Sequence, residues 1–185
     1  MPSFDRPNDP DIPASPWITR FAPLVRSGGH ILDVAAGYGR HTRHFLGQGY
    51  KVTAVDIDVS GMSDLKDQIG LILLEVDLEM GDWPFPESAF DGIVVTNYLH
   101  RPHFPQLIDS LAADGVLIFE TFGQGNEKLG RPRNPNFLLE SGELLRAFGD
   151  NLNVVAYELG SEQTPRPAVR QRLCATKRTD AVPLN

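Results

Sequence analysis

The sequence has few of the features that mark several common classes of protein. Its 185 residues include a single cysteine, Cys174, which cannot form an internal disulfide, and the N-terminus MPSFDRPNDPDIP lacks the basic-then-apolar pattern of a signal peptide. No apolar run approaches the roughly 18 residues that cross a bilayer. We therefore expect a cytoplasmic protein with no membrane partner.

Positive charge is also scarce. Lysine and arginine total 17 against 24 aspartates and glutamates, which gives a formal net charge of -7. A large surface for nucleic acid needs clustered cations, so this composition disfavours a nucleic-acid partner. The sequence predicts no metal site either.

The residues that are present suit one globular domain. A hydrophobic content of 41 % over this length provides one core but not two sizeable ones. Five prolines fall in residues 1–16, a composition that resists regular structure. We expect a flexible arm over 1–16, the domain over 17–177 and a short tail over 178–185, in a protein that is a monomer or a weak dimer.

Short apolar runs alternate with stretches of helical spacing. The runs are rich in β-branched residues, as strands buried on both faces should be, and lie at 30–35, 51–56, 71–76, 91–97 and 115–121. The helical stretches between them each end at glycine, and cover 41–49, 59–70 and 103–115. This alternation predicts an α/β fold with a parallel sheet and helices on both faces.

The C-terminal third predicts one more helix and a hairpin. Residues 140–148 have helical spacing, with Ser141 as the expected N-cap. The segments 153–160 and 168–177 alternate as strands and flank a proline-containing loop. The complete expectation is a Rossmann-like, seven-stranded, mostly parallel sheet with a reversed C-terminal strand.

The stretch ILDVAAGYGRHT (31–42) lies at the first strand-to-helix turn of this sheet. Gly37 and Gly39 let a ligand approach the backbone there, in the ligand crevice of an open α/β fold. Asp33 ends the first strand, and Asp56 ends the second, where a carboxylate can accept hydrogen bonds from both ribose hydroxyls. The pattern predicts a nucleoside ligand.

Two nucleoside cofactors compete for this pattern. A nicotinamide dinucleotide carries a pyrophosphate, which the carboxylate of Asp33 would repel. In addition, Thr42 stands where the dinucleotide fingerprint needs a third glycine or alanine. S-adenosylmethionine has a ribose for Asp56 and an ammonium and a sulfonium for Asp33, and we predict it as the cofactor.

LDVAAGYGRHT resembles the first motif of the class I methyltransferases, and VDID (55–58) resembles their acidic second motif. One departure is Ala35, where the family usually has its first glycine. We expect the basic residues Arg40, His41, Arg43 and His44 to face mostly solvent. The residues expected to bind the cofactor are Asp33, Ala35, Gly37, Gly39, Arg40, Asp56, Ile57, Asp77, Leu78 and Asn97.

A closer resemblance is found in TNYLHRPHFPQL (96–107) and FETFGQGNEKLGRPRNPNFLLESGELL (119–145), which are similar to small bacterial methyltransferases grouped with tellurite-resistance proteins. The resemblance implies a small-molecule acceptor, either a thiol or a tellurium or selenium oxyanion. A metabolite bearing a carboxylate or an amine, or a protein acceptor, stays open. So does a module that binds the cofactor without turnover and supports a partner enzyme.

Residues near the end of the fourth strand are the candidates for chemistry. The Asn/Asp-Pro-Pro-Tyr signature of amino methyltransferases is absent, and Asn97-Tyr98-Leu99-His100 stands in its place. Tyr98 could lie beside the methyl group, and His100 could act as a general base, since the reference pKa of histidine is near 6.5. Packing or capping is the alternative for both side chains.

The long, Gly- and Pro-rich connection 122–139 follows a strand whose end faces the crevice. Loops of this length at such a place are often functional, and we expect it to cover the site. Arg131 and Arg133 would then place two cations over an anionic substrate, with Arg101 and Tyr98 as further substrate contacts. Solvated loop arginines are the alternative.

Overall fold

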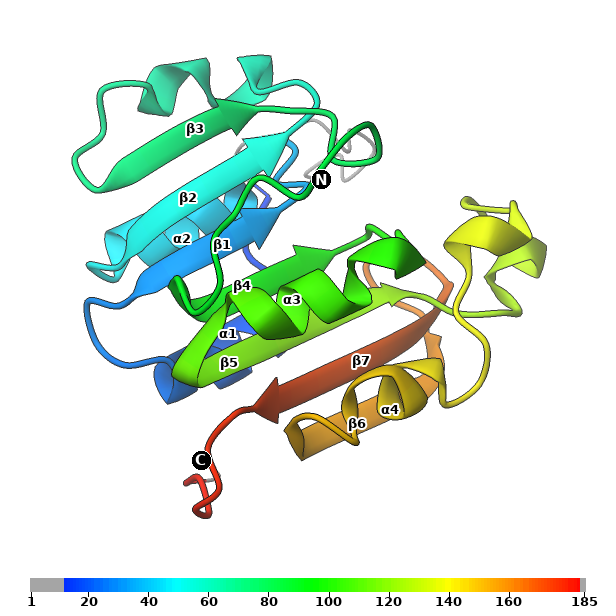
Figure 1. The fold of residues 1–185 in the computed structure, drawn as a ribbon. Helices are drawn as coiled ribbons and strands as arrows, with labels where there is room; N and C mark the ends of the chain where they lie inside the picture. The colour runs from blue at the N-terminus through cyan, green and yellow to red at the C-terminus, as the bar shows by residue number, and fades with distance from the viewer. Residues whose placement is uncertain (1–11, 184–185) are drawn as a thin grey trace.

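A computed structural model describes residues 12–183 of the chain and has a seven-stranded sheet at its centre, in the order β3-β2-β1-β4-β5-β7-β6 (Figure 1). The strands are β1 (His30–Val34), β2 (Lys51–Asp56), β3 (Leu71–Glu75), β4 (Phe90–Thr96), β5 (Leu111–Phe122), β6 (Asn153–Glu162) and β7 (Ala168–Thr176). Strands β1 to β5 pair in parallel, and β7 runs antiparallel to both β5 and β6. The predicted fold class and the reversed C-terminal strand are confirmed.

Helices cover both faces of the sheet, as predicted. The α-helices are α1 (Pro16–Phe21), α2 (Arg40–Gly47), α3 (Phe104–Ser110) and α4 (Glu143–Phe148), and the short 3-10 helices are η1 (Ala22–Leu24), η2 (Ser60–Leu65), η3 (Arg101–His103), η4 (Asn126–Lys128) and η5 (Pro135–Phe137). Alternate strand residues belong to two cores: Ile31 packs with residues of α1 and α2, and Leu32 with residues of α3 and α4. The strands are therefore apolar on both faces.

Two of the predicted crossover helices are wrong in part. Residues 59–70 form only the six-residue η2, in which Met62 has the non-helical angles φ -116° and ψ 17°. Polar side chains compete with a helix here, since the Ser60 amide donates to Asp58 Oδ1 at 2.9 Å. Helix α3 ends at Ser110 because Leu111 already pairs with Phe90 in the sheet, so Gly115 lies inside β5 and does not cap a helix.

The predicted N-cap of the helix near residue 140 is also wrong. Helix α4 begins at Glu143, and Gly142, with φ 71°, takes the capping position instead of Ser141. By contrast, Ser15 caps α1 through its side chain, which accepts a hydrogen bond from the Trp17 amide at 3.2 Å. Most of the predicted flexible arm, residues 1–11, lies outside the described residues, and the domain limits stay predictions.

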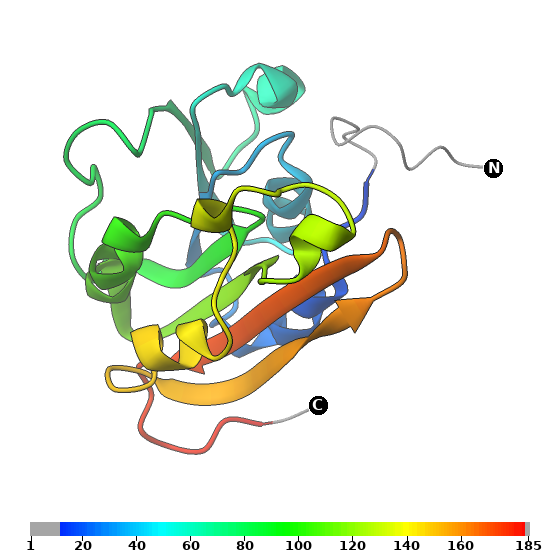
Figure 2. The ribbon, with the colours of Figure 1, turned by 90° about the vertical axis from the view of Figure 1, so that its right-hand side faces the viewer.

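The carboxyl ends of the parallel strands meet at one edge of the sheet. Figure 2 views the molecule from this edge, with the connection between β5 and α4 running across it. Within residues 12–183 no helix has the length and hydrophobicity to cross a membrane. The edge is where the sequence places the ligand crevice.

Candidate functional site

Asp33 is a fully buried carboxylate near the end of β1. Its Oδ2 accepts a hydrogen bond from Thr42 Oγ1 at 2.7 Å, while its Oδ1 is buried and has no partner within the described residues. Burial raises the pKa of Asp33 to about 6, although the hydrogen bonds from Thr42 act in the opposite direction. A buried, unpaired carboxylate oxygen is costly, so this site is suited to a cationic group.

The turn after β1 leaves open space at Gly37. Ala35, Gly37 and Gly39 all have positive φ, of 53°, 58° and 75°. A Cβ atom on Gly39 would lie 2.6 Å from Met62 Cγ, whereas one on Gly37 would meet no atom within 4 Å. Gly39 is thus required for packing, and Gly37 borders space that a ligand can enter.

Asp56, at the end of β2, fixes this turn. Its Oδ2 accepts from the Gly37 amide at 2.7 Å, and its Oδ1 accepts from the Asp58 amide at 3.1 Å. Each carboxylate oxygen can accept a second hydrogen bond, so the group is oriented and still able to bind hydroxyls. Ile57, next to it, is 65 % exposed and offers apolar surface at the same place.

Asp77 and Leu78 follow β3 and lie close to Asp56. The Val76 amide donates to the Asp56 carbonyl oxygen at 2.9 Å, which brings the two strand ends together. Leu78 is buried, and its carbonyl oxygen is 2.8 Å from His103 Nε2. We call Asp33, the turn 35–39, Asp56, Ile57, Asp77 and Leu78 the nucleoside side of the site.

Tyr98 and His100 lie toward this nucleoside side. The Tyr98 hydroxyl is buried without a partner among the described residues, and burial together with Glu79, Asp77 and Asp56 raises its pKa. The Nδ1 atom of His100 is 3.8 Å from Glu79 Oε2, and its ring centroid is 4.4 Å from that of His103. The predicted catalytic roles of Tyr98 and His100 stay predictions.

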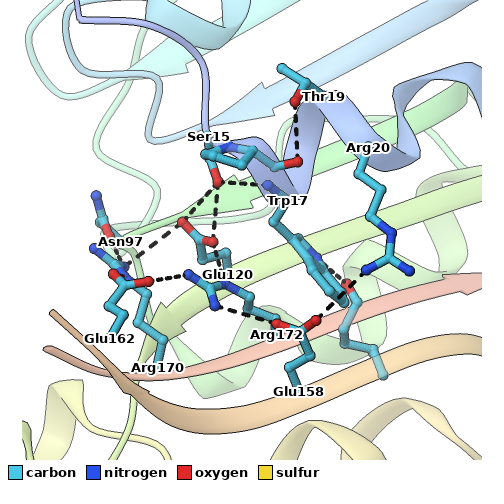
Figure 3. A network of polar contacts seen from close by, with 12 residues as sticks. Ser15, Trp17, Thr19, Arg20, Asn97, Glu120, Glu158, Glu162, Arg170 and Arg172 are labelled. Carbon is cyan, nitrogen blue, oxygen red and sulfur yellow. Dashed lines mark hydrogen bonds and ion pairs between the residues drawn. The ribbon is translucent and has the colours of Figure 1, made fainter. Parts of the chain in front are cut away.

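A buried polar network occupies the other half of the edge (Figure 3). Glu120, near the end of β5, is 3 % exposed and accepts from Ser15 Oγ at 3.1 Å and from Arg172 Nε at 2.6 Å. Arg172 also donates to Glu162. Ser15 thereby attaches the segment before α1 to the sheet.

Asn97 and Arg170 complete this network. Arg170 donates through Nη1 to Asn97 Oδ1 at 2.7 Å and through Nε to Glu162 at 2.6 Å. Its guanidinium carbon also lies 4.4 Å from the centroid of the Phe122 ring. We call Ser15, His41, Asn97, Glu120, Glu162, Arg170 and Arg172 the acceptor side.

The expectation that His41 faces solvent is wrong, because it is 1 % exposed. Its Nε2 accepts from the Ser15 amide at 3.2 Å, so its Nδ1 carries the proton and donates to Thr96 Oγ1 at 3.3 Å. Burial lowers the pKa of His41 to about 3, which keeps the ring neutral. His41 therefore joins α2 to the acceptor side.

Arg40 and Arg43 differ in their contacts. Arg43 pairs with Asp64 through two hydrogen bonds, of 2.8 and 2.9 Å. Arg40 is half-buried and makes no hydrogen bond or ion pair within residues 12–183. Burial and the charge of Arg170 lower the pKa of Arg40, while Glu120 and Asp33, one from each side of the site, raise it.

Arg101 holds the connection between β5 and α4. It donates to Glu143 Oε1 at 2.6 Å and to the carbonyl oxygens of Asn136 and Leu138 at 2.8 and 3.0 Å. A polar cavity of about 410 Å³ lies beside it, lined by Arg101, Gln124, Pro135, Asn136, Leu138, Glu140 and Glu143. The predicted substrate contact of Arg101 stays a prediction.

Arg131 and Arg133 are exposed in the same connection, between η4 and η5. Exposure suits either a lid over the site or a solvated loop. Their expected position over an anionic substrate therefore also stays a prediction.

Sequence reasoning missed the network of the acceptor side, since Asn97 was expected to bind the cofactor, a role that stays a prediction. One signal was available, because Glu120 is a charged residue inside the apolar run GVLIFET. A second was the pair Arg170 and Arg172, which alternate along a buried strand. Charges at such places are normally paired with one another.

Known proteins are similar to this chain in sequence and in fold. Residues 31–113 match the sequence model of a family described as a methyltransferase domain. Ribosomal RNA small subunit methyltransferase H of Nostoc punctiforme is 34 % identical over 91 residues, which cover 44 % of this chain and 29 % of that protein. The chain thus spans less than a third of the length of that curated relative.

Solved structures show the same fold. TehB from Haemophilus influenzae has a TM-score of 0.70 at 16 % identity, over 85 % of this chain and 60 % of that one. The 1,6-didemethyltoxoflavin-N1-methyltransferase of Burkholderia thailandensis, solved with bound S-adenosylhomocysteine, has a TM-score of 0.66 at 21 % identity, over 86 % and 75 %. The chain therefore has the fold of these class I methyltransferases, and its residues 31–113 are similar to a methyltransferase domain, in agreement with the resemblance seen in its motifs.

Proposed function

We propose that the protein is an S-adenosylmethionine-dependent methyltransferase that acts on a small-molecule acceptor. The observation that carries the proposal is the unpaired Oδ1 of the buried Asp33, whose strand leads into the turn with open space at Gly37. The cofactor carries an α-ammonium group, which matches this unpaired oxygen. The acceptor half of the proposal rests on the resemblance to small bacterial methyltransferases.

The residues of the nucleoside side fit the rest of the cofactor. Asp56 keeps free acceptor capacity on both oxygens for the ribose hydroxyls, and Ile57 and Leu78 offer apolar surface to the adenine. When bound, S-adenosylmethionine supplies a methyl group on a sulfonium. The chain's own contribution is to hold and orient the two reactants, which can lower the barrier of such a displacement by up to about 7–11 kcal/mol.

For the acceptor we propose a thiol or a tellurium or selenium oxyanion. The resemblance of residues 96–107 and 119–145 to tellurite-resistance methyltransferases supports this class, as does the fold of TehB. Amines and carboxylates are the next candidates, since the toxoflavin enzyme with the same fold is an N-methyltransferase. A cofactor-binding subunit without turnover and a protein methyltransferase are the alternatives.

Ribosomal RNA is a further candidate, because the curated relatives are named for it. The match to them covers less than half of this chain, and the net charge of -7 disfavours a large phosphate-binding surface. An RNA acceptor is therefore included in the turnover test for comparison with the small molecules.

Titration calorimetry with S-adenosylmethionine and its demethylated product tests the cofactor. Asp56→Ala should weaken binding at least tenfold, because hydrogen bonds to a charged group contribute about 1.5–3 kcal/mol each. Asp67→Ala is the matched control, since Asp67 is exposed and outside the site. Equal affinities in wild type and Asp56→Ala would remove Asp56 from the site and contradict the proposal.

Release of demethylated cofactor tests turnover across thiols, tellurite, selenite, amines, carboxylates and a small-subunit ribosomal RNA transcript. We expect turnover with a thiol or an oxyanion. Tight cofactor binding without turnover of any acceptor would favour the subunit alternative.

A further inference from the structure

Asn97 lies just beyond β4, at the centre of the candidate site. Strand β4 pairs with β1 on one side and β5 on the other, so the residue lies between the Asp33 strand and the Glu120 strand. Its backbone has φ 55°, and its amide donates to the Glu120 carbonyl oxygen at 2.9 Å. Its side chain is exposed at the edge of the sheet where a ligand would lie.

Arg170 fixes which end of the Asn97 amide is available. A guanidinium has only donors, so the group that lies 2.7 Å from Arg170 Nη1 must be the amide oxygen. Arg170 itself cannot easily turn, because it is bound by Glu162, stacked on Phe122 and 15 % exposed. Figure 3 shows Asn97 at one end of this network.

The amide nitrogen of Asn97 is therefore left to donate. Within residues 12–183 it makes no other hydrogen bond, and the half-buried Arg40, also without a partner there, lies within electrostatic reach of Arg170. Both groups present N–H donors and no acceptor. They suit a carboxylate, carbonyl or oxyanion oxygen and offer nothing to an ammonium.

We propose that the Asn97 amide selects acceptors that carry a hydrogen-bond-accepting oxygen beside the atom to be methylated, with Arg170 as the positioning residue. This rests on the proposed function, and it reverses the choice made by the Asn/Asp-Pro-Pro-Tyr signature, which grips an amino nitrogen. Here the amide oxygen is already occupied by Arg170. The proposal favours anionic thiols and oxyanions over amines.

The test is binding of two small probes, acetate and methylammonium, to the full chain labelled with ¹⁵N. The Asn97 side-chain amide signal, assigned by its loss in Asn97→Asp, is followed by NMR with and without the demethylated cofactor. We expect acetate to shift this signal and methylammonium to leave it in place. A shift caused by methylammonium, or none caused by acetate, would overturn the proposal.

Cofactor binding is measured separately by calorimetry on the same samples. Loss of cofactor binding would count against the proposed function, while the response of Asn97 to the two probes is read independently of it.

Variants separate the contact from the network around it. Asn97→Asp keeps an acceptor beside Arg170 but removes the donors, and should weaken acetate binding at least tenfold while allowing methylammonium to bind. Arg170→Met frees the amide to turn and should abolish the discrimination between the probes. Arg26→Met is the control: this exposed arginine pairs with Asp91 near the start of β4, away from Asn97 and Arg170, and its loss should keep the discrimination.

If Arg170→Met does not fold, the exposed Asn97→Asp variant still decides the donor role of the amide. An equal loss of discrimination in Arg26→Met and Arg170→Met would show that the effect does not depend on the contact between Arg170 and Asn97. That result would overturn the positioning role of Arg170.

Discussion

The nucleoside side and the acceptor side of the candidate site differ in whether their buried carboxylates are fully paired. Asp33 leaves one carboxylate oxygen unpaired, whereas both oxygens of Glu120 are bonded, to Ser15 and Arg172. An unpaired buried group raises the free energy of the unliganded protein. A ligand that pairs with the group offsets this cost. A paired group holds structure in place. Under the proposed function, the first group binds the cofactor and the second holds the surrounding structure.

The largest expected effect sharpens this comparison through stability. Glu120→Gln should lower the free energy of unfolding by about 2–3 kcal/mol, because Arg172 keeps Glu162 but loses the charge of its second buried partner. Asp33→Asn should raise it by about 1–2 kcal/mol at pH 7, because burial of the ionised carboxylate is costly there. Urea unfolding measures both, and changes of the same sign would break the comparison.

A pH series tests the two sides against each other. Between pH 6 and pH 4 the unfolded chain protonates His41, whose folded pKa is about 3, so this residue makes stability fall as the pH falls. Asp33, with a folded pKa of about 6, does the opposite, since it binds its proton first in the folded state. Each slope is at most about 1.4 kcal/mol per pH unit.

Asp33→Asn should therefore lose stability more steeply than wild type below pH 6, and His41→Asn less steeply. Urea midpoints at pH 4, 5, 6 and 7 give the slopes. Parallel curves for the three proteins would contradict the assignment of these pKa values.

The smallest expected effect concerns the turn of the nucleoside side. Ala35 has φ 53°, a conformation that costs a residue with a Cβ atom about 1–2 kcal/mol. Ala35→Gly should therefore stabilise the fold by up to about 1 kcal/mol after the entropy cost of glycine. Ala36→Gly, in the same turn without a positive φ, should destabilise it, and thermal unfolding that ranks the two variants the other way would count against strain at Ala35.

The nucleoside side could be predicted from the sequence because its main contacts are local. Asp33 and Thr42 fall within one motif, and Gly37 and Asp56 are at successive strand ends of a predicted parallel sheet. The acceptor side depends on distant residues, since Ser15 and Glu120 are 105 positions apart. No local sequence pattern predicts such a pair.

The errors have the same physical origin. His41 looked like part of a solvated basic set, but it lies one helical turn from the buried Phe45, on the face of α2 that packs on the sheet. Residues 59–70 had the spacing of a helix, yet their serine and aspartate side chains bond the backbone and leave only η2. Tertiary packing decided the burial of His41, and competition from side-chain hydrogen bonds decided the structure of residues 59–70.

Cofactor affinity as a function of pH tests the central claim, that Asp33 is the unpaired anion of the binding site. Calorimetry with S-adenosylmethionine from pH 5 to pH 8 should show wild-type affinity falling about tenfold per pH unit below pH 6, as Asp33 takes up a proton. Asp33→Asn should bind more weakly at pH 8 and show no such decline. Equal affinity and equal pH dependence in the two proteins would contradict the account.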